Sequence, residues 1–497
     1  MKISLSFIAR SVLLFVLVIA MLLLVNKILL PKTYYTHDWP STSTFAGFYQ
    51  MDKNSVDVLF FGSSHGVSSF IPQEIYDQYG ICSYNLSSEQ QNPFVSYYWL
   101  KEACKYQTPK AVVLESFIFF PYNGAEALNS SESCTRYAFD AMRYSDIKAE
   151  AIADIELYDK NQDARTYYWT NKRFHTRIKG NLGENDFLFS EIESHNDMKG
   201  YSCLNQHCGL EFVPFAADDS VEAVPMVPLM EEYVIKIVEY CRENHIDLII
   251  VSTPSQGQTQ GHNKSLRSFC KEHDVEYVDF NMNTIYASIA YNFANDNYDG
   301  GHLAYWGAIK VSDYLGTFLQ KRGVPAKSDP QWEESRVFYN HMIQKAKLKD
   351  IVDINEYLEA IKDQGFAVFI SAKDDASCGL SEQTVERLRQ LGLAPSITGH
   401  DSFRASYYAV LIPGKQPIEY SSMSAIQTQG QFRNGKSYYS LLSAGLECGN
   451  ASSIIIDGYE YSTNYRGLNI VVYDPISRQV FDSVCFDTCD AANPAIR

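Results

Sequence analysis

The chain has 497 residues, and its 42 Lys and Arg against 59 Asp and Glu give a formal net charge of −17. A 46% hydrophobic fraction excludes an intrinsically disordered chain, because it supplies enough apolar side chains for packed cores. The chain is acidic and has no Lys/Arg-rich block, so nucleic acid is not an expected partner. At roughly 100–200 residues per domain, the length predicts two or three domains.

The first 32 residues predict a membrane anchor. From Val12 to Leu30 only Asn26 and Lys27 interrupt an apolar run, which has about the ~20 residues that a helix needs to cross a bilayer. Basic residues precede the run, so the N-terminus is expected in the cytoplasm and the bulk of the chain outside it. The alternative is a cleaved signal peptide, although the run is longer than the usual ~7–15-residue apolar region. Residues 33–53 are interpreted as a stalk.

Residues 54–325 alternate apolar and amphipathic segments, which predicts an α/β domain. The expected strands are Val56–Phe61, Ile81–Leu86, Ala111–Leu114, Leu248–Ser252 and Tyr277–Phe280, and the expected helices are Pro93–Tyr106, Leu229–Asn244 and Ala304–Leu319. Such alternation predicts a parallel sheet with helices on both faces and a ligand site at the carboxyl ends of the strands. An insertion at about residues 118–225 is either a lid or substrate-binding subdomain, or a passive decoration.

The pattern of apolar and charged residues changes after residue 325. Residues 326–349 are charged and are interpreted as a connector to a second domain at 350–497. Short β runs dominate that domain. They are Phe366–Ser371, Ser406–Ile412, Ser453–Ile456 and Leu468–Tyr473, with a helix at Ser381–Leu391.

The first strand runs directly into a candidate nucleophile. The sequence from Phe60 to His65 reads FFGSSH. Gly62 permits a tight turn and leaves room for a substrate, and Ser64 would stand at the carboxyl end of the strand beside a helix N-terminus. Backbone N–H groups there can stabilise a developing oxyanion. Serine-rich turns are common after strands, so the segment becomes informative only with a matching base.

The segment after the last predicted strand supplies that base. It contains DGGHLAYWGA, in which Asp299 and His302 lie three positions apart just before a helix. A general base needs a carboxylate that fixes its tautomer and stabilises the imidazolium, and an Asp-x-x-His turn supplies both groups. His65 is the alternative base, but it is adjacent to Ser64 in the sequence and is expected to point elsewhere.

These motifs resemble those of the SGNH/GDSL hydrolase superfamily, and most nearly its extracytoplasmic branch related to DltD and to the alginate O-acetylation proteins. The resemblance covers about residues 54–320 and rests on VLFFGSSH, SYNLSSEQQ, IIVSTPSQ and DGGHLAYWGA. It implies a flavodoxin-like parallel sheet. It also implies that Ser64 is the nucleophile, His302 the general base and Asp299 the residue that orients the base.

The oxyanion donors of the family are only partly matched. Where the family carries a glycine donor, this chain has Ser87, whose backbone N–H is expected to serve. The Gly-x-Asn motif expected after the third strand is missing, since that strand continues as VVLESFIFF. Asn85 and Gln91 are the expected substitutes. Loss of one such donor costs about 10²–10³ in rate, which bears directly on catalysis.

The second domain is similar to the interleukin-like EMT inducer (ILEI/PANDER) domain. The similarity covers about residues 350–492 and rests on FISAKDDASCGL, LRQLGL, FRASYYAVLIPGK and RGLNIVVYDPISRQVFDSVCFDT. It implies a compact, β-sandwich-like fold with helices that binds a carbohydrate or a protein partner and takes no part in catalysis.

The cysteines do not predict a metal centre. There are eleven, and two pairs lie close in the sequence, Cys203 with Cys208 and Cys485 with Cys489. Neither pair has a second half at zinc-ligand spacing, and disulfide pairing cannot be deduced from sequence. No GxGxxG or P-loop pattern follows a strand, so no metal or other cofactor is predicted.

Together these features predict a membrane-anchored, extracytoplasmic serine acyltransferase or esterase that acts on a cell-envelope glycan. O-acetyl transfer is favoured slightly over hydrolysis, and the family resemblance implies a membrane-bound O-acyltransferase as partner. The alternative is a catalytically inactive SGNH-like scaffold that binds envelope glycans. The distance between the Ser64 hydroxyl and the His302 ring separates the two hypotheses.

Overall fold

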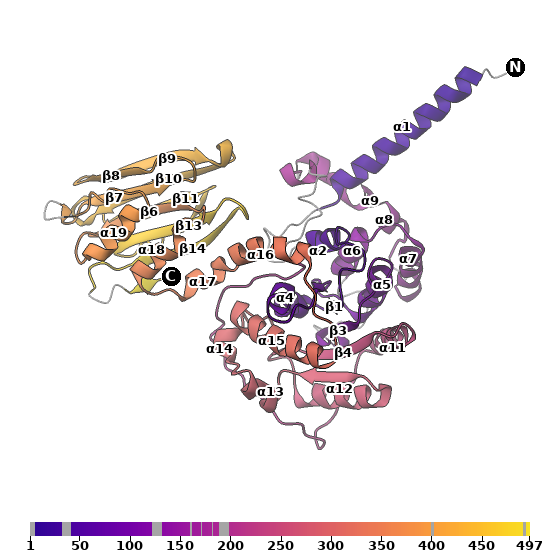
Figure 1. Cartoon of the computed structure of the whole chain (residues 1–497). Coiled ribbons are helices and arrows are strands. Elements are labelled where there is room, and N and C mark those ends of the chain that lie inside the picture. The colour runs from indigo at the N-terminus through magenta and orange to yellow at the C-terminus, as the bar shows by residue number, and fades with distance from the viewer. Residues whose placement is uncertain are drawn as a thin grey trace. The chain divides into compact units, whose positions relative to one another are not determined.

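The computed structural model describes residues 5–31, 41–121, 132–159, 162–169, 171–180, 182–187, 198–398, 402–490 and 494–497. The chain divides into two compact units, Met1–Tyr339 and Asn340–Arg497 (Figure 1). The segment expected to be an insertion, about 118–225, lies partly outside the described residues.

The chain opens with one long apolar helix, α1 (Leu5–Leu29). Its segment Phe7–Leu29 has a mean hydropathy of 2.9, and its most apolar 18-residue window is not buried against the rest of the protein. It is therefore long and apolar enough to cross a membrane, as a membrane anchor or as a signal sequence.

A five-stranded parallel sheet forms the centre of the first unit. Its strands are β1 (Val58–Phe61), β2 (Ser83–Asn85), β3 (Ala111–Glu115), β4 (Asp247–Ser252) and β5 (Glu276–Asp279). The strand order is β2-β1-β3-β4-β5, and every pairing is parallel. This order is that of flavodoxin-like sheets, which bind ligands where the order reverses, here between β1 and β3.

Helices cover both faces of this sheet, as predicted. Leu59, Phe61, Val112 and Leu114 belong to one hydrophobic cluster with residues of several helices, and the alternate side chains face the other way, where Phe60 stacks on Phe70. Besides α1, the described residues of the first unit form the helices α2 (Ser41–Phe48), α3 (Ser64–Ser69), α4 (Pro72–Tyr79), α5 (Pro93–Ala103), α6 (Glu132–Ala141), α7 (Asp146–Tyr158), α8 (Arg165–Tyr168), α9 (Asn171–Phe174), α11 (Pro228–Glu243), α12 (Gln260–His273), α13 (Asn283–Ser288), α14 (Phe293–Asp296), α15 (Tyr305–Lys321) and α16 (Pro330–Met342). The last three residues of α16 belong to the second unit.

The three predicted helices of this unit form with boundaries close to those expected. Helices α5 and α11 each begin with a proline at the first turn, where its missing N–H costs nothing. Helix α11 buries Tyr233, Val234 and Ile237 on one face, in agreement with its helical periodicity.

The interpretation of residues 33–53 as a stalk is wrong for its second half. Residues 41–48 form helix α2, and its Phe45 and Phe48 are fully buried in the core of the first unit. Phe45 stacks on Trp99 at 4.3 Å between ring centroids. Burial removes the apolar surface of these aromatic side chains from water and so stabilises the folded chain, whereas a solvated stalk would leave them exposed. Residues 32–40 lie outside the described residues.

The second unit is β-rich, as predicted. Its strands are β6 (Ala367–Asp374), β7 (Ser406–Leu411), β8 (Ile418–Ser422), β9 (Ile426–Phe432), β10 (Ser437–Gly445), β11 (Ala451–Ile456), β12 (Tyr459–Glu460), β13 (Gly467–Asp474), β14 (Gln479–Phe486) and β15 (Ala495–Ile496). They form one ten-stranded sheet around the central strands β6 and β13. The described residues of this unit also form helices α17 (Gln344–Asp350), α18 (Ile354–Ile361) and α19 (Glu382–Gln390). Helices α16 and α17 together cover most of residues 326–349, so the predicted connector is largely helical.

Candidate active site

Ser64 lies where β1 ends and α3 begins. The chain turns at Gly62, which has a φ of +155°, and Ser63 caps α3 by accepting a hydrogen bond from the His65 N–H. A Cβ atom at position 62 would lie 2.4 Å from the Cβ of Glu115. Only glycine therefore allows β1 to run this close to the end of β3 before the chain reaches Ser64.

Glu115 holds this turn in place. Its Oε2 accepts hydrogen bonds from the Ser63 N–H at 3.0 Å and the Ser63 hydroxyl at 2.7 Å, and its Oε1 accepts one from the Phe117 N–H at 2.5 Å. Burial raises the pKa of the Glu115 carboxyl, against the lowering effect of these hydrogen bonds. Because Ser63 is bonded directly to Ser64 in the chain, the hydrogen bonds from Ser63 to Glu115 also hold Ser64 in position.

The Ser64 hydroxyl lies within hydrogen-bonding distance of the predicted base. Its Oγ is 2.8 Å from Nε2 of His302, and Nδ1 of His302 is 2.8 Å from Oδ2 of Asp299. The structure therefore brings together the three residues that sequence reasoning selected from segments far apart in the chain. Their arrangement is that of a serine, a base and an orienting carboxylate, and their catalytic roles remain predictions.

A hairpin turn fixes Asp299 and His302 relative to each other. Asn297 and Leu303 form an antiparallel bridge, and the Tyr298 N–H donates to the His302 carbonyl at 2.8 Å. Within this turn, Oδ1 of Asp299 accepts the N–H groups of Gly301 and His302, each at 2.8 Å. The short Asp-x-x-His segment therefore supplies a rigid pair.

These contacts also set the protonation states. Burial would raise the pKa of the Asp299 carboxyl, but hydrogen bonds from the His302 ring and from two backbone N–H groups outweigh burial and hold it well below its usual range. An ionised carboxylate can only accept, so the tautomer that this contact favours carries its proton on Nδ1 of His302. In that tautomer the lone pair of Nε2 accepts the hydrogen bond of the Ser64 hydroxyl.

The loop after β4 supports the turn from the side. The Gln256 N–H donates to the Gly300 carbonyl at 2.8 Å, and the side-chain amide of Asn297 donates to the Pro254 carbonyl at 3.3 Å. A Cβ atom at position 300 would lie 2.9 Å from the Gln256 Oε1. Residues 254 and 256, which follow β4, thus contact the turn that carries His302. They belong to the motif Ile249–Gln256 on which the sequence resemblance partly rests.

The three side chains are open to a ligand. Ser64 is half-buried, and the side chains of His302 and Asp299 are 22% and 47% exposed. The hydroxyl and the base therefore face solvent at the carboxyl edge of the sheet, where a substrate can reach them.

His65, the alternative base of the sequence analysis, has a different environment from His302. Its ring is buried, stacks on Phe117 at 3.9 Å between centroids and lies edge-on to the His302 ring at 4.9 Å. Its Nδ1 makes no hydrogen bond to the described residues. Burial, and then the charge of His302, lower the pKa of His65 to about 3. His65 is therefore neutral near pH 7 and packs against the base.

The three residues expected to donate to an oxyanion are engaged elsewhere. The Ser87 N–H donates to Oδ1 of Asn85 at 3.1 Å, and the Asn85 amide donates to the carbonyls of Gly66 and Phe70 at 2.9 and 3.2 Å. The Gln91 side chain accepts from the Ser88 hydroxyl at 2.8 Å and donates to the Ser96 hydroxyl at 3.1 Å. These contacts stabilise the loop beside α3, and the expectation that Ser87, Asn85 or Gln91 donates to an oxyanion stays a prediction.

Sequence reasoning missed Glu115 and Ser63. Glu115 stands in VVLESFIFF, where only the absence of Gly-x-Asn was noted. An acidic residue at the end of an otherwise apolar buried strand is a signal in itself, because a buried carboxylate needs hydrogen-bond donors.

Comparisons with solved structures find G-D-S-L-type proteins. A G-D-S-L family protein from Desulfitobacterium hafniense is 13% identical over 53% of this chain and 99% of its own, with a TM-score of 0.27. A GDSL-like lipase from Bacteroides thetaiotaomicron is 9% identical over 56% and 99%, with a TM-score of 0.26. No protein-family model and no curated protein matches the chain. The assignment of the fold therefore rests on the strand order and the register of the sheet.

The lowered pKa of His65 predicts an acid-dependent loss of stability. Between its ordinary pKa of 6.5 and its folded value of about 3, the unfolded chain binds one more proton than the folded chain. Stability should therefore fall as the pH drops below 6.5, by up to about 1.4 kcal/mol per pH unit from this group. We expect the thermal midpoint of the full chain in detergent, followed by circular dichroism, to fall more steeply with decreasing pH than that of His65→Gln.

His175→Gln is the matched control, because His175 is an exposed histidine of the same unit. It should keep the steep pH dependence of the unmodified chain. Equal slopes for His65→Gln and the unmodified chain would contradict the assignment of His65 as a buried neutral histidine.

Proposed function

We propose that this protein is a membrane-anchored, extracytoplasmic serine acyltransferase or esterase that acts on a cell-envelope glycan. The observation that carries the proposal is the chain of contacts from Ser64 Oγ through both nitrogens of His302 to Asp299, at 2.8 Å each. The apolar helix α1 supports a location at a membrane.

The proposed reaction proceeds through an acyl-enzyme. Ser64 Oγ attacks the carbonyl carbon of the acyl donor, and His302 Nε2 takes the hydroxyl proton. When the tetrahedral intermediate collapses, His302 returns the proton to the leaving alcohol and the acyl group stays on Ser64. In the second half, His302 takes the proton of an acceptor hydroxyl, whose oxygen attacks the acyl carbonyl carbon. The bond between Ser64 Oγ and the acyl group then breaks, and His302 returns the proton to Oγ. Asp299 stabilises the imidazolium in both halves.

The acceptor decides between transfer and hydrolysis. A sugar hydroxyl gives O-acetyl transfer and water gives hydrolysis, and both use the same intermediate. The resemblance to the DltD and alginate O-acetylation proteins favours transfer slightly, with a membrane-bound O-acyltransferase as the partner that delivers the acyl group. Transfer requires that the glycan exclude water from Ser64.

The second unit is proposed to bind the glycan or a protein partner. The support is the resemblance of residues 350–492 to the ILEI/PANDER domain, together with the β-rich fold of this unit. A module that holds the polymer on the same chain raises its effective concentration at Ser64.

The alternative is a catalytically inactive scaffold that binds envelope glycans. It is favoured by the engagement of Ser87, Asn85 and Gln91 inside the protein, which leaves the oxyanion donors unassigned. The short Ser64–His302 distance counts against it, because a scaffold does not need a serine aligned with a base.

Hydrolysis of an activated aryl acetate by the purified chain tests the catalytic residues. We expect Ser64→Ala and His302→Gln each to remove nearly all turnover. Asp299→Asn should lower kcat by about 10⁴-fold, because the base then loses its preferred tautomer. Ser220→Ala should leave turnover unchanged, since Ser220 is exposed and bonds only to Asp218 among the contacts described. Equal turnover in Ser64→Ala and in the unmodified chain would refute a Ser64 acyl-enzyme and favour the scaffold.

The glycan acceptor is tested in cells that produce the protein. We expect the Ser64→Ala chain to be made and localised normally while O-acetylation of the envelope glycan is lost. The readout is the ester-linked acetate released from purified envelope polysaccharide by mild base. Unchanged acetate with the Ser64→Ala chain would rule out glycan acylation, even if aryl acetate hydrolysis depends on Ser64.

A further inference from the structure

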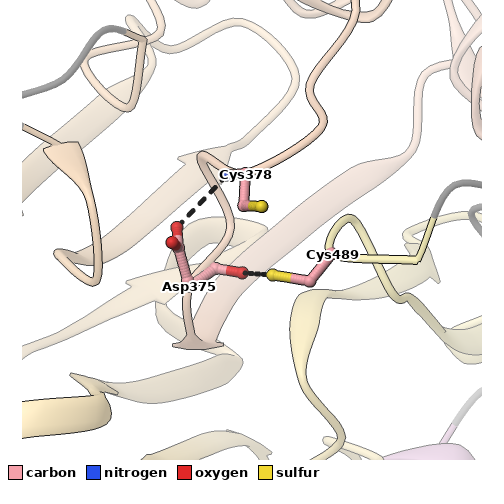
Figure 2. Close-up of side chains that lie close together, drawn as sticks. All are labelled: Asp375, Cys378 and Cys489. Atoms are coloured by element: carbon pink, nitrogen blue, oxygen red, sulfur yellow. Dashed lines mark hydrogen bonds between the residues drawn. The ribbon is translucent and has the colours of Figure 1, made fainter.

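A cluster of reactive side chains lies in the second unit, in a different part of the chain from Ser64, Asp299 and His302. Asp375 follows β6 directly, Cys378 lies three residues further on, and Cys489 follows the end of β14. The two sulfur atoms and a carboxylate oxygen of Asp375 all lie within 4.8 Å of one another. Figure 2 shows the sulfur atoms of Cys378 and Cys489 facing the same space beside Asp375.

The fold holds these two segments together. Strands β6 and β14 both pair with β13. Gly379 has a φ of +80°, and a Cβ atom there would lie 2.3 Å from the carbonyl oxygen of Thr488. The Cys378 loop can therefore approach the chain next to Cys489 only because residue 379 is glycine.

The segment before Cys489 is fixed as well. Arg466 donates to both carboxylate oxygens of Asp487, with the shortest contact at 2.8 Å, and Asp487 accepts the Cys489 N–H at 3.1 Å. The Cys489 sulfur lies 3.1 Å from the main-chain carbonyl oxygen of Asp375 (Figure 2). The position of Cys489 thus depends on contacts outside the cluster, which is typical of a preformed site.

One oxygen of the Asp375 carboxylate has no hydrogen-bond partner among the described residues. Asp375 is only 3% exposed. Its Oδ1 accepts the Ser377 N–H at 2.8 Å, the Ser377 hydroxyl at 2.7 Å and the Cys378 N–H at 3.2 Å. Its Oδ2 is buried and has no hydrogen-bond partner among the described residues. A buried carboxylate oxygen without a partner is costly, so a ligand is expected to satisfy it.

We propose that Asp375 Oδ2, Cys378 Sγ and Cys489 Sγ bind a zinc ion, with a water molecule as the fourth ligand. Two thiolates and a carboxylate are zinc ligands, whereas magnesium and calcium prefer oxygen alone. Ligand atoms around a tetrahedral zinc lie about 3.5–3.8 Å apart, so atoms that lie within 4.8 Å of one another need to approach by at most about 1 Å. Binding releases the two thiol protons, and coordination to the ion gives Asp375 Oδ2 the partner that it lacks among the described residues.

A disulfide between Cys378 and Cys489 is the competing chemistry. It would suit the predicted extracytoplasmic location, where oxidants are available. It would leave Asp375 Oδ2 buried without a partner, which zinc explains and a disulfide does not. Spacing in the sequence pairs Cys489 with Cys485 instead, but the Cys485 sulfur lies 3.2 Å from the Arg466 carbonyl oxygen.

The test titrates the full chain in detergent with Zn²⁺ and, separately, with Co²⁺, after reduction and removal of metal and reductant under argon. We expect one equivalent of Zn²⁺ to bind and to raise the thermal midpoint. One equivalent of Co²⁺ should give sulfur-to-cobalt charge-transfer absorption and the visible bands of tetrahedral cobalt.

Single variants localise the metal. Cys378→Ser and Cys489→Ser should each lower the Zn²⁺ affinity by more than the roughly 10–100-fold cost of losing an outer-shell partner, and so should Asp375→Asn. Cys378 is exposed, so Cys378→Ser tests the site without disturbing the core. Cys448→Ser is the matched control, because Cys448 is another cysteine of the second unit, 3.3 Å from the Ser406 hydroxyl, and it should leave the affinity unchanged.

Two results would overturn the proposal. One is a reduced, folded chain that binds no Zn²⁺, or binds it equally well in Cys378→Ser. The other is a metal-free chain that, purified without reductant, carries a Cys378–Cys489 disulfide by peptide mass mapping and shows the same thermal midpoint with and without Zn²⁺ after reduction.

Discussion

The hydrogen bond from His302 Nδ1 to the Asp299 carboxylate is the contact on which the account of the first unit depends. It fixes the tautomer of His302, and only in that tautomer can Nε2 accept the proton of Ser64. Both residues belong to one hairpin turn, in which two backbone N–H groups stabilise the ionised Asp299 carboxylate. His302 is thus oriented by the fold itself, which is the kind of preorganisation that the proposed role as a base requires.

The parallel sheet brings the segment after β1, which carries Ser64, next to the end of β3, which carries Glu115. Ser64 follows β1, and the strand order reverses between β1 and β3, so the end of β3 lies beside it. Glu115 at that end anchors Ser63, and the Gly62 turn makes room for Glu115. A carboxylate therefore takes the place where the resembled family carries its Gly-x-Asn motif. Ser64, the proposed nucleophile, is therefore held in place through the contacts of its neighbour Ser63.

The parts of the structure that local sequence dictates were predictable. Strands β1, β3 and β4 are short apolar runs buried on both faces, and α11 follows a clear helical period. Strand β9 reads IQTQGQF, and only Ile426 and Phe432 at its two ends are buried, so no apolar pattern marks it. Ser64, Asp299 and His302 were found because their motifs are local. Glu115, the engaged amides of Asn85 and Gln91, and the Asp375–Cys378–Cys489 cluster depend on contacts between distant segments, which spacing cannot show.

Reaction of the purified chain with a serine-reactive fluorophosphonate, followed by intact-mass and peptide mass spectrometry, tests the central claim most directly. The aligned hydroxyl and base predict one adduct, located on Ser64, that is absent in Ser64→Ala and forms much more slowly in His302→Gln. An unlabelled chain, under conditions that label a control serine hydrolase completely, would contradict the account. So would an adduct that forms at the same rate in His302→Gln, because Ser64 would then react without the base that lies 2.8 Å from it.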